Sequence, residues 1–96
     1  MAEWSFLTNH AHVLLCIRDD QDIRMRELAA KVQISERAVK RIVADLERTG
    51  YLSRQRFGRR NRYEIHDEQL VRSPLARTLE IGALLALLLP FVSSSL

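Results

Sequence analysis

The sequence predicts a mainly helical α+β fold that combines several helices with a small β-hairpin. Apolar residues recur at helical spacing in the first half of the chain, and the spacing changes to alternation directly after Gly50. The length of 96 residues holds one small core and leaves no room for a second. We therefore expect a main domain over residues 1–72 and an apolar C-terminal helix over 73–96.

The first two helices are predicted from a capping residue and from apolar spacing. Thr8 is a typical N-cap for a helix over about 9–18, and a second, short helix is expected over about 26–32. Between the two helices, residues 23–25 fit a brief edge strand. We expect residues 1–7 to form an arm whose aromatic side chains pack onto the domain.

The third helix has the clearest amphipathic pattern. Ser35 is a typical N-cap for a helix over about 36–49, and Gly50 is typical of the C′ position that ends a helix. The inward face carries apolar residues at the spacing i, i+3, i+4, i+7, namely Val39, Ile42, Val43 and Leu46. The outward face carries the basic residues Arg37, Lys40 and Arg41.

The segment that follows is predicted to be an arginine-rich hairpin. Residues 51–56 and 62–65 alternate as two strands do. The segment 57–61 between them is predicted as the turn, with Gly58 and Asn61 as the residues that tolerate positive φ. The hairpin arginines are Arg54, Arg56, Arg59, Arg60 and Arg62. Because side chains alternate along a strand, these arginines cannot all face one way.

The C-terminal segment is apolar and is predicted to be helical. Ser73 and Pro74 suit the N-cap and first position of a helix that runs to about residue 89, where Pro90 stops it. The uncharged run 81–92 would span only about 18 Å as a helix, against about 30 Å for a bilayer core, so we expect no membrane span. Because the run is apolar on all sides, we expect a second copy of the chain to cover it. The expected dimerisation residues are Leu79, Leu84, Leu85 and Leu88.

Positive charge is concentrated in the centre of the chain. Residues 37–62 carry nine basic and two acidic side chains, a net charge of +7, whereas each flank has a net charge of −2. Arginine outnumbers lysine 13 to 2, and the guanidinium fork suits phosphate oxygens and the guanine edge. A basic centre between acidic flanks indicates a protein that binds a polyanion, with a solvated, solubilising face as the alternative.

The other reactive side chains form no recognisable site. A single cysteine, Cys16, excludes an intramolecular disulfide and a cysteine-rich zinc site. His10 and His12 lack a carboxylate cluster at ligand spacing, so we expect neither a metal nor another cofactor. With no catalytic triad, phosphate loop or paired carboxylates visible, we expect no enzyme. The lone cysteine and the lack of a secretory signal predict a cytoplasmic protein.

Residues 28–46, 50–52 and 56–63 together resemble a bacterial or archaeal winged helix-turn-helix transcriptional regulator of the MarR-like type. The spacing LAxxVxIS followed by VxxIV, a later leucine and GYL carries the resemblance, which covers about residues 8–66. The inter-helix turn often has glycine where this chain has Gln33. The chain is shorter than full MarR-type proteins, whose flanking helices build the dimer interface and effector pocket, so no small-molecule effector is assigned.

The resemblance implies sequence-specific binding of double-stranded DNA by a homodimer that regulates transcription. The third helix would enter the major groove with Ser35, Arg37, Lys40 and Arg41. In the hairpin, the tip residues Arg59 and Arg60 would reach a minor groove, and Arg54, Arg56 and Arg62 would contact phosphates. The alternative is a winged-helix module that docks a protein through the C-terminal apolar helix, or that binds RNA.

Overall fold

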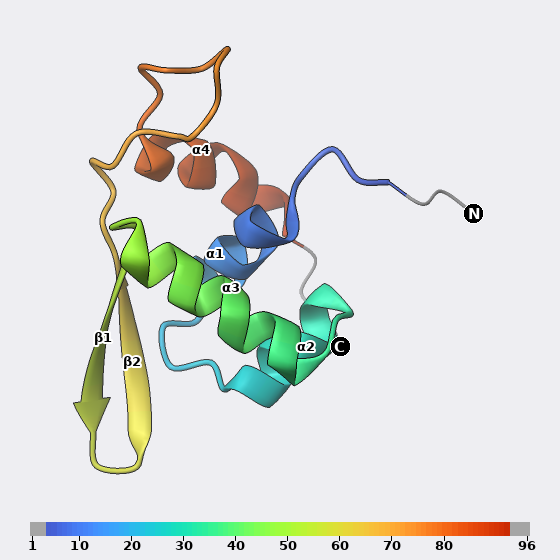
Figure 1. Ribbon diagram of the computed structural model, residues 1–96, viewed down its shortest axis with the longest axis vertical. Helices are drawn as coiled ribbons and strands as arrows, with labels where there is room; N and C mark the ends of the chain where they lie inside the picture. Colours follow the sequence, from blue (N-terminus) through green and yellow to red (C-terminus); the bar gives the residue numbers. More distant parts are fainter. Residues whose placement is uncertain (1–3, 93–96) are drawn as a thin grey trace.

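The computed structural model describes residues 4–92, which form four α-helices, a two-stranded hairpin and a short 3₁₀ helix (Figure 1). In chain order the elements are α1 (Asn9–Asp19), α2 (Met25–Val32), α3 (Glu36–Arg48), β1 (Leu52–Phe57), β2 (Arg60–Ile65), α4 (Ile81–Leu88) and η1 (Leu89–Phe91). The expected α+β class is confirmed. Residues 1–3 and 93–96, at the two ends of the expected units, lie outside the described residues.

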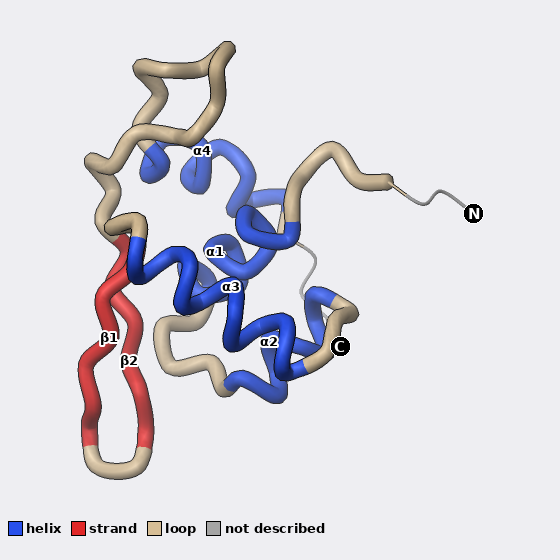
Figure 2. Tube along the Cα trace, in the orientation of Figure 1, coloured by secondary structure: helices blue, strands red, loops and turns tan. Residues whose placement is uncertain are grey.

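A single hydrophobic core joins the helices to the base of the hairpin. The predicted apolar face of α3 is buried, and α1 and α2 each turn apolar side chains toward it. The core consists of Val13, Leu14, Leu15, Ile17, Ile23, Leu28, Ala29, Val39, Ile42, Val43, Leu46, Tyr51, Leu52, Tyr63, Ile81 and Leu85. Each fully buried aliphatic side chain contributes about 1.5–3 kcal/mol, so this cluster is the main source of stability. Figure 2 shows the helices grouped together and the hairpin projecting from them.

A left-handed residue makes the turn between α2 and α3. Gln33 stands where this turn often has glycine. It lies at φ 66° and ψ 44°, in the left-handed region that glycine adopts most easily. The N–H groups of Gln33 and Ile34 both donate to the Ala29 carbonyl, at 2.8 and 3.1 Å. The chain then reaches Ser35, whose Oγ accepts from the Ala38 N–H at 3.1 Å and caps α3 as predicted. The helix-turn-helix is thus formed as expected.

The hairpin is tighter than the sequence predicts. β1 and β2 pair antiparallel up to Phe57 and Arg60, so the turn consists of Gly58 and Arg59 rather than the whole of 57–61. Gly58 has φ 62°, which a type II′ turn needs at its first loop residue. Primed turns match the twist of paired strands, so the ladder extends right up to the turn.

The loop between α1 and α2 runs beside β2 without becoming a strand, so the edge strand expected over 23–25 is wrong. A main-chain hydrogen bond joins the loop to the hairpin, from the Tyr63 N–H to the Gln21 carbonyl at 3.2 Å. The Glu27 side chain accepts from the Arg24 N–H at 3.0 Å and fixes the start of α2. The backbone therefore enters the helix before a strand ladder can extend.

α4 begins at Ile81, so the helix expected over 74–89 is wrong in its first half. The chain folds back on itself before α4. The Val71 N–H donates to the Leu79 carbonyl at 2.7 Å, and the Ile81 N–H donates to the Gln69 carbonyl at 2.7 Å. A helix that started at residue 74 would need the Leu79 carbonyl and the Ile81 N–H for its own i to i−4 bonds. The two arrangements therefore exclude each other.

The short α4 lies against α1 and contributes to the core. Ile81 and Leu85 are buried, and Leu84, Leu88 and Val92 pack at the edge of the core. Figure 1 shows α4 and the loop before it at the end of the domain opposite the hairpin tip. No helix within residues 4–92 is long and apolar enough to cross a membrane.

Candidate nucleic-acid interface

The outward face of α3 presents the basic residues that the sequence predicts. Arg37, Lys40 and Arg41 are all exposed, and within residues 4–92 none of them forms an ion pair. Ser35 stands at the start of the helix, where N–H groups without helical partners favour a phosphate. The face therefore combines free cations with the positive end of a helix dipole.

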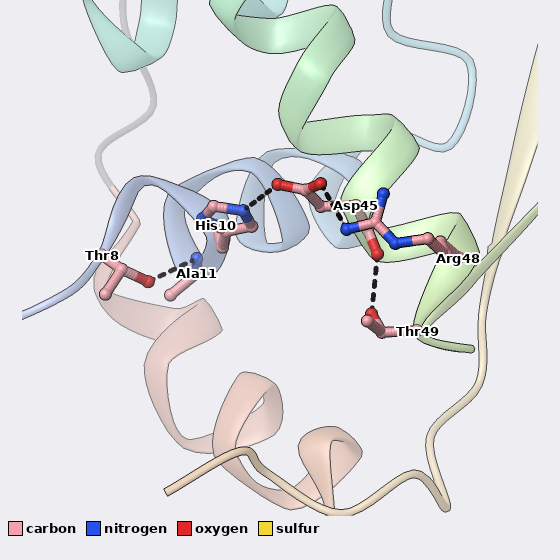
Figure 3. Close-up of polar contacts among 6 residues, drawn as sticks. All are labelled: Thr8, His10, Ala11, Asp45, Arg48 and Thr49. Carbon is pink, nitrogen blue, oxygen red and sulfur yellow. Dashed lines mark hydrogen bonds and ion pairs between the residues drawn. The ribbon is translucent and has the colours of Figure 1, made fainter.

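Asp45 joins α3 to α1 and also bonds residues at the end of its own helix (Figure 3). Asp45 of α3 accepts a hydrogen bond from His10 Nε2 at 3.0 Å and another from Arg48 at 2.8 Å. These bonds, that of His10 first, lower the pKa of the Asp45 carboxyl. The Thr49 hydroxyl also donates to the Asp45 carbonyl at 2.7 Å. The C-terminal half of α3 is thus tied to the first turn of α1.

The C-terminus of α3 ends in a Schellman motif. Gly50, at φ 90°, donates its N–H to the Glu47 carbonyl, and the Tyr51 N–H donates to the Leu46 carbonyl at 2.9 Å. The predicted role of Gly50 is confirmed, because a left-handed residue is required here.

The linker after the hairpin satisfies two further carbonyls at the same place. His66 Nδ1 donates to the Gly50 carbonyl at 2.9 Å, and Gln69 Nε2 donates to the Thr49 carbonyl at 2.9 Å. A Cβ added at Gly50 would lie 2.8 Å from that Gln69 nitrogen, so a side chain there would force the Gln69 amide to move and would disturb its bond to Thr49. Both ends of α3 are therefore capped, and its apolar face packs into the core.

The hairpin, which we call the wing, distributes its arginines over two faces, as alternation requires. In the register of the ladder Arg54 is opposite Tyr63 and Arg56 is opposite Asn61, so these four share one face. The other face carries Gln55 opposite Arg62 and Phe57 opposite Arg60. Arg59 is at the tip of the turn.

Three of the five wing arginines are engaged within the chain. Arg54 Nε lies 3.2 Å from a carboxylate oxygen of Glu47 on α3. Arg56 Nε donates to the carbonyl of Gly58 at 3.2 Å. Arg62 pairs with Asp22, as described below. The assignment of these three arginines to phosphates stays a prediction, and each would have to leave its partner in the chain to bind DNA. Arg59 and Arg60 form no ion pair within the described residues.

Arg62 contacts both the loop between α1 and α2 and the wing itself. Its Nε donates to Asp22 Oδ1 at 3.0 Å and its Nη2 donates to Asp22 Oδ2 at 3.4 Å. The guanidinium also lies over the Phe57 ring, 5.1 Å from its centroid. The hydrogen bond from Arg62 lowers the pKa of the Asp22 carboxyl.

Two further exposed cations stand at the start of α2, and one of them, Arg24, lies near the wing. Arg24 and Arg26 form no ion pair within residues 4–92. Arg24 lines a groove of about 390 Å³ between the loop and the wing, together with Arg59 and Arg60. The sequence could have identified both residues, because they stand at the start of a predicted helix, where free N–H groups favour an anion.

The expected dimerisation leucines occupy different environments. Leu85 is 1% exposed in the core of its own chain, so it is not free to contact a second copy, and this assignment is corrected. Leu84 and Leu88 are half-buried at the edge of the core, and Leu79 lies in the loop before α4. One side of this apolar segment completes the core of its own chain, and the other side, with Leu87 and Phe91, is exposed.

The N-terminal arm packs less closely than predicted. Leu7 contacts the core, but Trp4 and Phe6 are 69% and 92% exposed and stack edge-to-face on each other. Cys16 is partly buried, and burial raises the pKa of its thiol. Among residues 4–92 no group of three or more His, Cys, Asp or Glu side chains could hold a metal ion.

Comparison with known proteins points to one family. The MarR family model matches residues 8–57, which include the helix-turn-helix and the first strand of the wing. Among solved structures, the chain is similar to the zinc-dependent MarR family transcriptional regulator AdcR in its Zn(II)-bound state, with a TM-score of 0.50 and 24% identity. The match covers 70% of this chain and 47% of that one, so this chain spans about half of that structure. No curated protein matches. The chain belongs to the MarR family, whose members are DNA-binding transcriptional regulators and not enzymes.

Proposed function

We propose that this protein is a homodimer that binds double-stranded DNA sequence-specifically, with α3 in the major groove and the wing beside it. The observation that carries the proposal is a set of exposed cations without an acidic partner in the described residues: Arg37, Lys40, Arg41, Arg59 and Arg60. A free cation keeps its full attraction for phosphate, whereas a paired one must first give up its partner.

The spacing on α3 suits direct readout of bases. Arg37 and Arg41 are four residues apart, so they project from neighbouring turns of one helix face. A guanidinium that binds guanine O6 and N7 through two bonds discriminates against the wrong base by about 1–3 kcal/mol. Because both ends of α3 are capped, its side chains keep a fixed register on the groove. We assign Lys40 and the helix start at Ser35 to phosphates.

The wing suits a second contact on the same duplex. Its tip residues Arg59 and Arg60 would enter an adjacent minor groove, where a narrow A·T tract attracts arginine. Arg54 and Arg56 remain candidates for phosphates, because an exposed ion pair is worth only about 0–1 kcal/mol and DNA can compete for the cation. Arg24 is a further candidate for a phosphate contact, because it lines the same groove as Arg59 and Arg60.

A second copy of the chain is the proposed partner at the opposite end of the domain. The large exposed apolar side chains there are Trp4, Phe6, Leu70, Leu75, Leu87 and Phe91. They belong to the arm, to the loop before α4, and to α4 and η1, which Figure 1 shows away from the wing tip. A second copy that covered them would remove this apolar surface from water. In such a dimer the two α3 helices would have to lie one DNA turn, about 34 Å, apart to bind a palindromic site.

The test is selection of bound sites from a random duplex pool, followed by titration of the selected site and of an unrelated duplex at several salt concentrations. If each protomer contacts about four phosphates, the dimer should give a log–log salt slope near −7. A slope shallower than about −2, or no enriched sequence, would contradict DNA binding by this surface. It would favour the alternative of a winged-helix module that docks a protein or binds RNA.

The dimer is tested separately by sedimentation of a variant in which Leu87→Asp and Phe91→Asp are combined. Both side chains are exposed, so the domain should stay folded while the copies separate and affinity for the selected site falls. A variant that remained dimeric would place the interface elsewhere. Because its proposed ligand is DNA, the protein would act in the cytoplasm.

A further inference from the structure

The outer half of the wing has little support from the core. Leu52 and Tyr63 are buried at its base, but from Arg54 onward the residues of β1 are exposed, and Phe57 near the turn is 54% exposed. Figure 1 shows the hairpin projecting past the helices. Since the loop between α1 and α2 is not a strand, no third strand stiffens the described hairpin. A two-stranded hairpin alone is marginally stable in water.

Two ion pairs reach the outer half: Arg54 pairs with Glu47 on α3, and Arg62, nearer the middle of β2, pairs with Asp22 in the loop between α1 and α2. The Asp22 carboxylate receives two hydrogen bonds from Arg62, and that guanidinium lies over the ring of Phe57 on the other strand. Arg62 thereby joins the loop, β2 and β1. Next to it, the Tyr63 N–H bonds the Gln21 carbonyl at 3.2 Å.

The anchor on the loop is itself fixed. The Asp22 N–H donates to Asp20 Oδ1 at 3.0 Å, and the Ile23 N–H donates to the Asp20 carbonyl at 3.2 Å. Ile23 is 3% exposed in the core. The carboxylate of Asp22 is therefore held by a short turn that a buried side chain secures, so it can restrain the wing rather than follow its motion.

We propose that the Asp22–Arg62 ion pair sets the orientation of the wing relative to α3, so that Arg62 is a positioning residue and not a phosphate contact. The proposal rests on the proposed DNA-binding function. The Asp22 carboxylate lies beside this basic surface and repels phosphate. The Arg62 guanidinium, which the carboxylate holds, compensates that repulsion. A wing that is already held in one orientation loses little conformational entropy when Arg59 and Arg60 bind DNA.

The first experiment needs no DNA. Heteronuclear ¹⁵N relaxation is measured at the Gly58 and Arg59 amides in Asp22→Asn, Arg62→Ala and the double variant. The matched control is Arg60→Ala, because Arg60 lies on the same strand and the same face as Arg62 but forms no ion pair within the described residues. Asp22→Asn, Arg62→Ala and the double variant should all raise the mobility of the tip, and the control should leave it unchanged. Arg62→Ala and the double variant should raise it at least as much as Asp22→Asn, because they also remove the guanidinium from the Phe57 ring. An unchanged tip in Asp22→Asn and Arg62→Ala would overturn the proposal, whatever the protein binds.

The second experiment measures affinity for the selected site and for an unrelated duplex against salt. Asp22→Asn and Arg62→Ala should each lower the ratio of the two affinities by up to about fivefold, the factor that an exposed ion pair can account for. The double variant should lose no more than Arg62→Ala alone, because the ion pair is already absent in that single variant. The salt slope should stay unchanged in Arg62→Ala and become shallower by about one per protomer in Arg60→Ala.

The opposite pattern would show that Arg62 contacts DNA directly. In that case Arg62→Ala would make the salt slope shallower as Arg60→Ala does, and Asp22→Asn would bind DNA more tightly because a competing acid is gone. If no variant and no wild-type protein bound any duplex, the proposed function would fail, and the relaxation measurement would still decide whether the ion pair orders the wing.

Discussion

Leu85→Ala should destabilise the domain far more than Leu87→Ala, although the two leucines lie two residues apart on α4. Leu85 is 1% exposed in the core, and Leu87 is 66% exposed. Truncation of a buried leucine to alanine costs about 2–5 kcal/mol because it removes apolar contacts and leaves a cavity. The same change on the surface costs no more than about 0.5 kcal/mol. For a domain stabilised by about 5–14 kcal/mol, the first change removes a large share of the stability.

Urea unfolding followed by far-ultraviolet circular dichroism measures this difference. With an m value of about 1–1.5 kcal/mol/M, a loss of about 3 kcal/mol lowers the unfolding midpoint by about 2–3 M. The titration is run at two protein concentrations, because binding to a second copy makes apparent stability concentration-dependent. The effect of Leu85→Ala should be the same at both, whereas any effect of Leu87→Ala should appear only at the higher one.

Equal losses in the two variants would refute this reasoning. They would mean that α4 does not use Leu85 to complete the core, and that a partner covers both of its sides. Deletion of residues 79–96 would not be a clean test of dimerisation. It removes Ile81 and Leu85 from the core, so loss of the dimer could not be separated from loss of the fold.

Three further predictions follow from local geometry. Gln33→Gly should raise the free energy of unfolding by up to about 1 kcal/mol, because glycine relieves the cost of φ 66°, and a loss of stability would contradict this role. The pKa of Asp45 is lowered in the folded state, so its contribution to stability is present above the ordinary aspartate pKa of about 4 and is lost as the pH falls through the lower folded-state value. Asp45→Asn should therefore be less stable than wild type at neutral pH and equal to it at low pH, and a gap that persisted at low pH would point to another cause. Arg37→Ala and Arg41→Ala should each reduce the preference for the selected DNA site by about 1–3 kcal/mol, and an unchanged preference would show that α3 does not read bases.

The elements that the sequence predicts well are those fixed by neighbours in the chain. Thr8 and Ser35 cap α1 and α3, and Gly50 ends α3, because caps depend on residues within one helical turn. The four-residue spacing of the α3 core face and of its basic face is equally local. The exposed cations of α3 could therefore be identified before the structure was known.

The errors occur where distant segments compete for the same backbone groups. The loop before α4 replaces a helix because Gln69 and Val71 take the N–H and carbonyl groups that the helix needed. Residues 23–25 do not form a strand because α2 already begins at Met25, where the Glu27 carboxylate accepts from the Arg24 N–H. In each case local propensity allowed two outcomes, and contacts elsewhere decided between them.

The sequence by itself determined the helix-turn-helix, the concentration of arginine in the wing and the apolar character of the C-terminal segment. Only the tertiary structure decided which of these side chains are free. Asp22 and Arg62 are 40 residues apart, so no spacing rule could pair them, and the fold brings them together at 3.0 Å. Leu85 and Leu87 belong to one apolar run, yet only packing against α1 makes one of them core and leaves the other exposed. Composition fixes how much charge and apolar surface a chain has, whereas burial and ion pairing depend on distances through space.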